Sequence, residues 1–146
     1  MEDSTMKITM NFTLEEMYKS NTATRKGINN MPDEKATNNL IDLCYSILQP
    51  IRTRWGDPIV VSSGYRCPKL NKAVGGSATS QHKTGEAADI HTLSDNRDWN
   101  KRLFDMIVKM VQSGEIVVGQ LIDEHNYDWI HISLPNSKHK NEILHL

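Results

Sequence analysis

The chain has 146 residues and a formal net charge of −1 at neutral pH. This length fits one domain, which can bury a hydrophobic core without disulfides or metals to staple it. The near-neutral charge gives no indication of nucleic acid or a membrane surface as a partner, and no stretch approaches the roughly 20 apolar residues of a membrane span. The first seven residues predict no secretory signal, so we expect the protein to be cytoplasmic as synthesised. Separately, we expect a monomer.

The two cysteines, Cys44 and Cys67, are too few for a disulfide framework or a four-thiolate zinc site. Cys44 lies on the apolar face of a predicted helix, where a thiol behaves as a small hydrophobic side chain. Cys67 lies between Arg66 and Pro68, and the sequence places no general base beside it that would support a nucleophilic role. The sequence does not decide whether the two cysteines form a disulfide bond with each other.

The start of the chain predicts short elements. Residues 1–10 are expected to be a flexible N-terminus. Thr13 and Glu16 have the spacing of a capping box, which predicts a short helix to about Ser20. The polar stretch 21–30 then predicts a loop.

The main helix of the first half is predicted to begin near Pro32, because proline is favoured in the first helical turn. Apolar residues recur at helical spacing from Ala36 to Leu48 and predict a side that faces the core. Pro50 should kink or restart the helix, and Gly56 should end it.

The middle of the chain alternates strands with a long polar stretch. Residues 59–61 predict a short strand, and residues 68–74 predict a helical turn. Residues 75–85 predict a loop, and loops of this length inside a compact domain are often functional. Residues 87–92 predict a second strand.

A second long helix is expected after a cap at Asn96, with Gly114 as its stop. Residues 119–123 and 129–134 predict the last two strands. The order of elements predicts an α+β fold, with helices on one face of a small, mostly antiparallel sheet. We expect a single domain over residues 11–135, followed by a charged C-terminal tail over residues 136–146.

Candidate metal ligands occur in the stretch 80–90, where His82 and Asp89 lie seven positions apart. Imidazole and carboxylate groups are usual ligands of zinc, and the small residues between them allow a close approach of the backbone. His131, on the non-core face of its predicted strand, is the obvious third ligand. His91 shares a strand face with Asp89 and is a rival ligand.

Three protein ligands leave one position for water, which is how catalytic zinc sites are built. Zinc would lower the pKa of that water to about 7 and so make hydroxide available near neutral pH. The ligand types by themselves also admit copper or nickel. We expect one zinc ion.

A series of motifs resembles the zinc D,D-peptidases, the group of D-alanyl-D-alanine carboxypeptidases and dipeptidases and of phage L-alanyl-D-glutamate endopeptidases (peptidase M15-like). The resemblance covers about residues 11–134 and implies a Hedgehog/D,D-peptidase-like fold with His82, Asp89 and His131 as metal ligands. The motifs are Phe-Thr-Leu-Glu-Glu at 12–16, Ser-Ser-Gly-Tyr-Arg at 62–66, Leu-Asn-Lys-Ala-Val-Gly-Gly at 70–76, Ser-x-His-x-x-Gly-x-Ala-x-Asp at 80–89 and Asp-x-x-His at 128–131.

The resemblance also implies the catalytic acid. The similar enzymes carry it three residues before the last ligand, which is Asp128 here, as the general base that deprotonates the attacking water. Strict strand alternation puts Asp128 on the face opposite to His131, so this role requires the chain to bend near Trp129. Glu124 and His125 are nearby alternatives.

Arg66 matches an arginine that the similar enzymes use to bind a substrate carboxylate or a polarised carbonyl oxygen, a role that suits its planar guanidinium. A salt bridge to an acid such as Asp57 is the alternative. Ser80 and Gln81, beside the first ligand, are expected to hydrogen-bond the substrate backbone, and two aromatic residues to line the cleft. The expected substrate-binding residues are Arg66, Ser80, Gln81, Tyr65 and Trp129.

The resemblance therefore implies a zinc metallopeptidase that acts on peptidoglycan stem peptides containing D-amino acids, as a carboxypeptidase or an endopeptidase. The alternative is a non-catalytic, zinc-containing binding module of the same fold, and the acid at position 128 argues against it. A phage-encoded lysis or virion-associated protein is compatible with the absence of a predicted signal. We expect action on the cell wall after release by phage lysis or by another export route.

Overall fold

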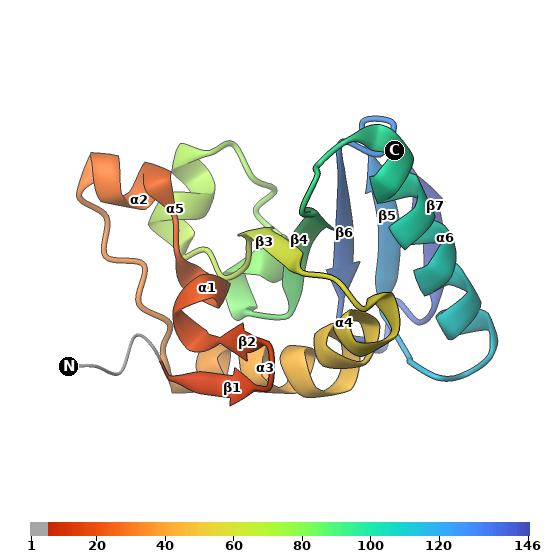
Figure 1. The fold of residues 1–146 in the computed structure, drawn as a ribbon. Helices are drawn as coiled ribbons and strands as arrows, with labels where there is room; N and C mark the ends of the chain where they lie inside the picture. Colours follow the sequence, from red (N-terminus) through yellow and green to blue (C-terminus); the bar gives the residue numbers. More distant parts are fainter. Residues whose placement is uncertain (1–5) are drawn as a thin grey trace.

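Two sheets and a set of short and long helices make up the computed structural model, which describes residues 6–146 (Figure 1). A two-stranded antiparallel sheet joins β1 (Lys7–Thr9) to β2 (Phe12–Thr13). The larger sheet has five strands in the order β3-β4-β6-β5-β7. Its pairs are antiparallel except for β5 and β7, which run parallel. The structure confirms the predicted α+β class and the mostly antiparallel sheet.

The strands of the larger sheet are β3 (Ile59–Ser63), β4 (Ala87–Thr92), β5 (Gln120–Glu124), β6 (Trp129–Ser133) and β7 (Glu142–His145). The α-helices are α1 (Leu14–Tyr18), α2 (Asn21–Lys26), α3 (Glu34–Leu43), α4 (Gln49–Trp55), α5 (Pro68–Ala73) and α6 (Arg97–Gln112). A π-helical turn, Cys44–Leu48, joins α3 to α4, and a 3₁₀ turn, Gln81–Thr84, precedes β4. None of the helices between residues 6 and 146 has the length and apolar character needed to span a bilayer.

The capping box predicted at the start of α1 is present. The Thr13 hydroxyl accepts a hydrogen bond from the Glu16 amide at 3.3 Å, and the Glu16 carboxylate accepts one from the Thr13 amide at 2.9 Å. These two bonds satisfy backbone donors that a helix start otherwise leaves unpaired. The local sequence therefore determines where the first helix begins.

The loop predicted for residues 21–30 is wrong over its first part, which forms α2. The Ser20 hydroxyl accepts a hydrogen bond from the Ala23 amide, and Gly27 ends the helix with a φ of 67°. Both caps are ordinary helix signals. The sequence between these caps has no apolar periodicity that would predict a helix, because only Ala23 is buried.

The helix predicted across Pro50 restarts just before this residue. Asp33 caps the first segment by accepting from the Ala36 amide at 2.8 Å, and Gly56 ends the last with a φ of 84°. Proline lacks an amide proton, and its ring crowds the carbonyl four residues earlier. The π-helical turn lies directly before Pro50, and the residues that flank it, Leu43 and Gln49, keep right-handed helical φ and ψ angles.

Both ends of the chain are more regular than the sequence predicted. Within the expected flexible N-terminus of residues 1–10, Lys7–Thr9 form β1 and bury Ile8, and residues 1–5 lie outside the described residues. Within the predicted tail, β7 pairs with β5 and packs Ile143 against the core. These strands were missed because partners distant in sequence stabilise them.

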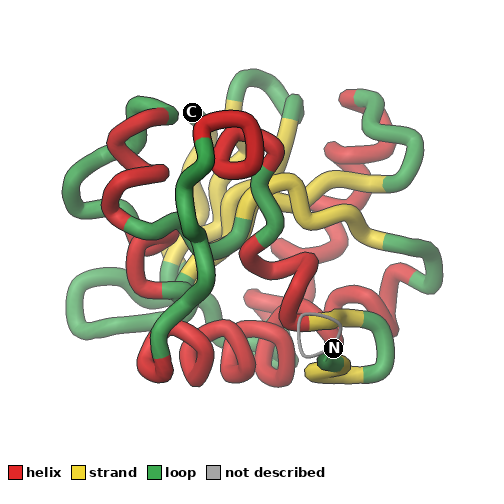
Figure 2. Tube along the Cα trace, turned by 90° about the vertical axis from the view of Figure 1, so that its left-hand side faces the viewer, coloured by secondary structure: helices red, strands yellow, loops and turns green. Residues whose placement is uncertain are grey.

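Alternation along β4 and β6 separates the core from the site. The apolar side chains on one face are fully buried with residues of α3, α4 and α6. Figure 2 shows the strands of the larger sheet in the middle of the molecule, with helices and loops around them. On the other face, Asp89 lies opposite His131. The core-facing residues of the two strands are Ala88, Ile90, Ile130 and Ile132.

We predict that Gly85→Ala lowers the free energy of unfolding by about 3 kcal/mol, because Gly85 has a φ of 77° and an added Cβ would meet the Ala36 carbonyl group of α3. Gly114→Ala is the matched control, since Gly114 also has a positive φ but open space around it, and should cost only about 1 kcal/mol. Urea unfolding of both variants measures the difference. Equal losses would contradict the close approach at Gly85.

Candidate metal centre

Three side chains from two strands and one turn converge on the face of the sheet opposite to the core. His131 Nδ1 lies 3.0 Å from Asp89 Oδ1, and His82 Nε2 lies 3.3 Å from the same oxygen. One potential ligand atom from each residue lies within 4.8 Å of the others. The structure thus brings together the three ligands that the sequence predicted.

The orientation of His82 is determined by the segment between β3 and α5. His82 Nδ1 lies 2.7 Å from the Gly64 carbonyl oxygen, and the Arg66 amide donates to the His82 carbonyl at 2.9 Å. A carbonyl oxygen can only accept, so Nδ1 carries a proton and donates to it, which leaves Nε2 as the nitrogen that faces Asp89. Gly64 cannot carry a side chain here, because a Cβ would collide with the Met17 carbonyl of α1.

The donor set and its spacing fit a metal ion. Ligand atoms about 2.0–2.1 Å from a tetrahedral zinc ion lie about 3.3 Å from one another. The two nitrogen–oxygen distances at Asp89, 3.0 and 3.3 Å, are close to this separation. The residues therefore could hold one cation between two imidazoles and one carboxylate.

The carboxylate of Asp89 is held in its charged form. Burial alone would raise its pKa, but hydrogen bonds from His131 and His82 outweigh this effect and hold the pKa of Asp89 well below its usual range. A carboxylate that stays ionised is ready to bind a cation across the physiological pH range.

Arg66 lies at the edge of the same site and is held on three sides. Its Nε donates to Asn71 Oδ1 at 3.1 Å, and its two terminal nitrogens lie 3.4 Å from the hydroxyls of Ser63 and Ser80. Burial lowers the pKa of Arg66 while the Asp89 carboxylate raises it, and arginine remains charged at neutral pH. These contacts give the guanidinium one orientation, with no ion pair to Asp57.

Asn71 is a site residue that the sequence reasoning missed. Its side chain is buried, accepts from Arg66 Nε and donates from Nδ2 to the Ser77 carbonyl at 2.9 Å. Gly76 packs so closely on this amide that an added Cβ would overlap it. Asn71 therefore ties Arg66 to the loop that follows α5. The signal that the sequence offered for this role was an asparagine directly after Leu70, a residue that is buried in the structure.

The other expected substrate-binding residues divide into two groups. Ser80, Gln81 and Trp129 line the cavity at the metal centre. Tyr65 does not, because its side chain is buried in the core and its amide donates to the Met17 carbonyl. The structure therefore places Tyr65 behind the site, where it supports the turn that carries Arg66.

Of the two candidate acids, only Glu124 lines the cavity. Glu124 lines the cavity, because it lies two residues after Ile122, which pairs with His131. Asp128 does not line it, and its exposed carboxylate lies 3.9 Å from Arg97 Nη2. The chain turns through residues 125–127 with positive φ angles, and this turn leaves Asp128 outside the cavity.

The rival ligand His91 and the two cysteines take no part in the candidate metal centre. His91 Nδ1 lies 2.7 Å from the Thr92 carbonyl oxygen, and His91 does not line the cavity.

Both cysteine thiols are free, so Cys44 and Cys67 form no disulfide bond with each other. Burial raises the pKa of the Cys44 thiol to about 12, which makes it unreactive at neutral pH. Cys67 caps α5 by accepting from the Leu70 amide at 3.4 Å.

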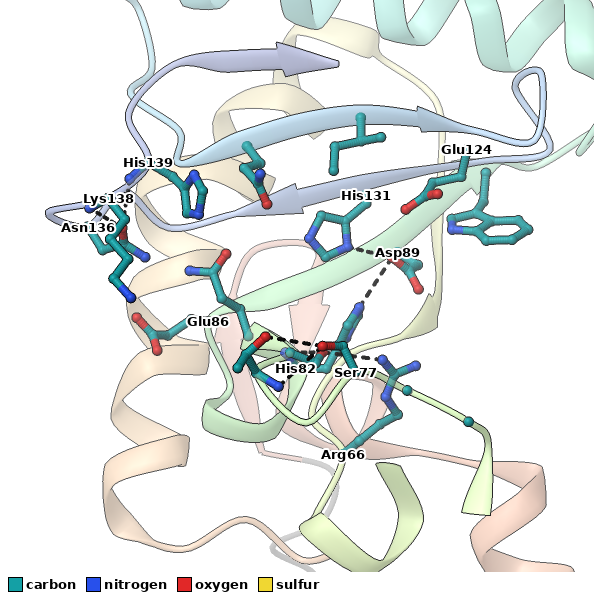
Figure 3. A pocket seen from close by; sticks show the side chains of 18 of the residues that line it. Arg66, Ser77, His82, Glu86, Asp89, Glu124, His131, Asn136, Lys138 and His139 are labelled. Carbon is teal, nitrogen blue, oxygen red and sulfur yellow. Dashed lines mark hydrogen bonds and ion pairs between the residues drawn. The ribbon is translucent and has the colours of Figure 1, made fainter. Parts of the chain in front are cut away.

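The cavity has a volume of about 970 Å³, which is large enough for a peptide ligand. Its floor is the metal-binding face of β4, β6 and β5, and its walls are the loop around residues 75–82 and a turn at residues 136–139. Figure 3 shows Arg66 and Glu124 beside the three candidate ligands and the C-terminal turn farther away along the cavity.

Comparison with protein families gives a match to peptidase M15 over residues 10–133. The matched segment contains the three candidate ligands, Arg66 and both candidate acids. The chain belongs to the peptidase M15 family. Comparison with curated proteins gave no match. Family membership and the metal-binding group together indicate a metallopeptidase.

We predict that His82→Ala lowers the affinity for zinc by at least about 100-fold, because it removes one of three protein ligands. His91→Ala is the control and should keep wild-type affinity, since His91 lies outside the cavity. Metal content by mass spectrometry and zinc titration of the metal-free protein measure both effects. Normal zinc stoichiometry in His82→Ala, with loss in His91→Ala, would transfer the ligand role to His91.

Proposed function

We propose that this protein is a zinc-dependent peptidase that hydrolyses peptidoglycan stem peptides containing D-amino acids. The observation that carries the proposal is the group of His82, Asp89 and His131 at the cavity, in a chain of the peptidase M15 family. Two imidazoles and one carboxylate are typical of catalytic zinc sites, which retain an open position. The substrate class rests on the resemblance of the motifs to zinc D,D-peptidases.

A bound zinc ion would supply Lewis acidity, which lowers the pKa of water to about 7 and polarises a carbonyl group. The protein contributes the geometry around it. Arg66, fixed by Asn71 and two serines, presents terminal N–H groups that can donate to an oxyanion as it forms on the scissile carbonyl. Because the guanidinium is already oriented, little reorganisation is needed during the reaction.

We assign the role of general base to Glu124. Side chains diagonally opposite each other on neighbouring strands lie about 7–8 Å apart, and Glu124 and His131 have this relationship. This separation leaves room for a water molecule between the carboxylate and the metal centre. Glu124 would accept a proton from the attacking water and later deliver it to the leaving amine.

Asp128, the acid indicated by the resemblance, is the competing candidate. Its role would require the turn at residues 125–127 to rearrange, so that the carboxylate leaves Arg97 and enters the cavity. The three positive φ angles in this turn, at His125, Asn126 and Tyr127, make it a strained segment. Glu124 needs no such movement.

We predict that the purified protein releases new amino groups from peptidoglycan, and that a chelator abolishes the release while added zinc restores it. Mass spectrometry of the soluble fragments identifies the bond that is cut. Cleavage of a terminal D-alanine would define a carboxypeptidase, and cleavage inside the stem peptide an endopeptidase. Zinc-dependent binding to peptidoglycan without any product would instead support a non-catalytic binding module.

We predict that Glu124→Gln lowers kcat by about 10²–10⁴-fold without loss of zinc, because an amide cannot accept the proton. Asp128→Asn should retain activity within about threefold, since its carboxylate pairs with a surface arginine and contributes little there. Steady-state kinetics and metal content are measured for both variants. The opposite result, with Asp128→Asn inactive and Glu124→Gln active, would return the role of base to Asp128.

A further inference from the structure

One wall of the cavity comes from a part of the chain that the family match does not include. The match ends at residue 133, whereas Asn136, Ser137, Lys138 and His139 all line the cavity. Figure 3 shows Asn136, Lys138 and His139 on the opposite side of the candidate ligands from Arg66. A substrate that spans the cavity would therefore meet this turn away from the bond that is cut.

The turn has a defined shape of its own. Asn136 Oδ1 accepts from the amides of Lys138 and His139, each at 2.8 Å, and the Asn136 amide donates to the His139 carbonyl at 3.0 Å. These bonds use the side-chain oxygen of Asn136 within the turn itself. The backbone at Lys138 is thereby fixed.

Strand β7 anchors the turn to the sheet. His139 Nδ1 lies 2.8 Å from Glu142 Oε1, and Gln120 of β5 donates to the same oxygen at 2.8 Å. The Glu142 amide donates to the Gly119 carbonyl at 3.0 Å, and the Gln81 side chain reaches the Leu134 carbonyl at 3.5 Å. The wall is thus held on both sides before any ligand arrives.

The ammonium group of Lys138 is not used in these contacts and can therefore pair with a ligand. Within residues 6–146 its ammonium group forms no ion pair, whereas the nearby His139 and Glu142 are bound to each other. Glu86 lines the same part of the cavity, where its carboxylate accepts from the Thr84 hydroxyl. Lys138 therefore presents a positive charge to a ligand from a rigid backbone, at the edge of a partly enclosed cavity.

We propose that Lys138 forms a carboxylate-binding subsite that makes the cavity select substrates with an acidic group distant from the cleaved bond. This inference rests on the proposed peptidase function and extends it to the substrate's remote part. A carboxylate placed there would pair with the ammonium group while Arg66 acts at the scissile carbonyl on the other side of the metal centre. The stem peptide offers such a group, because D-glutamate linked through its γ-carboxyl keeps a free α-carboxylate.

The test compares two synthetic stem pentapeptides that differ only in this group, one with free D-glutamate α-carboxylate and one with the amide. We expect the wild-type protein to prefer the acidic peptide, and Lys138→Ala to lower the ratio of the two kcat/KM values by about five- to twentyfold through KM. Lys138→Arg should retain most of the preference. Lys140→Ala is the matched control, because Lys140 is exposed two residues away and does not line the cavity.

Two further measurements separate this inference from the proposed function. Calorimetric binding of both peptides to the zinc-loaded protein and to its Lys138→Ala variant tests the subsite even where no hydrolysis occurs. Weaker binding of the acidic peptide by the variant supports the subsite, and Glu86→Gln should strengthen that binding by removing a nearby negative charge. An unchanged ratio or affinity in Lys138→Ala, an equal effect of Lys140→Ala, or no binding of either peptide would overturn it.

Discussion

The register between β4 and β6 is the constraint on which the site depends. It places Asp89 directly opposite His131, so that two of three candidate ligands meet without any loop having to position them. A slip of one residue would send one of them to the other face. The slip is opposed by the fully buried apolar residues on the core side of both strands, because it would bring them to the solvent. The hydrophobic core thus specifies the geometry of the candidate metal centre.

Close backbone contacts bring the remaining parts of the site to this sheet. Gly64 lies against the Met17 carbonyl, Gly76 against the Asn71 amide and Gly85 against the Ala36 carbonyl, and in each place a Cβ would overlap its neighbour. Glycine permits such approaches but loses more conformational entropy on folding than other residues. Residues of α3 and α4 pack with the sheet in one apolar cluster, and this burial favours the folded state. As a result, His82 and Arg66 are held in place before a ligand binds.

The charged groups of the cavity follow a simple arrangement along its length. Arg66 and Glu124 lie near the metal-binding group, where an oxyanion and a proton would have to be handled. Lys138 lies farther away, on a turn that the last strand anchors. Because Lys138 lies away from Arg66 and Glu124, it can serve a different part of one extended ligand. This arrangement connects the edge of the sheet at β7 with the choice of substrate.

The sequence by itself determined many of the local elements and the group of candidate metal ligands. Capping residues, helical periodicity and strand alternation act over a few residues, so α1, β4 and α6 could be predicted, and the motif around His82 and Asp89 indicated its partner His131. Only the tertiary structure decided which acid faces the cavity, because a turn with three positive φ angles carries Asp128 away and leaves Glu124 beside His131. It also decided that the last residues complete the cavity. Strand β7 gains its stability from pairing with β5, and contacts between segments so far apart in sequence leave no local pattern to read.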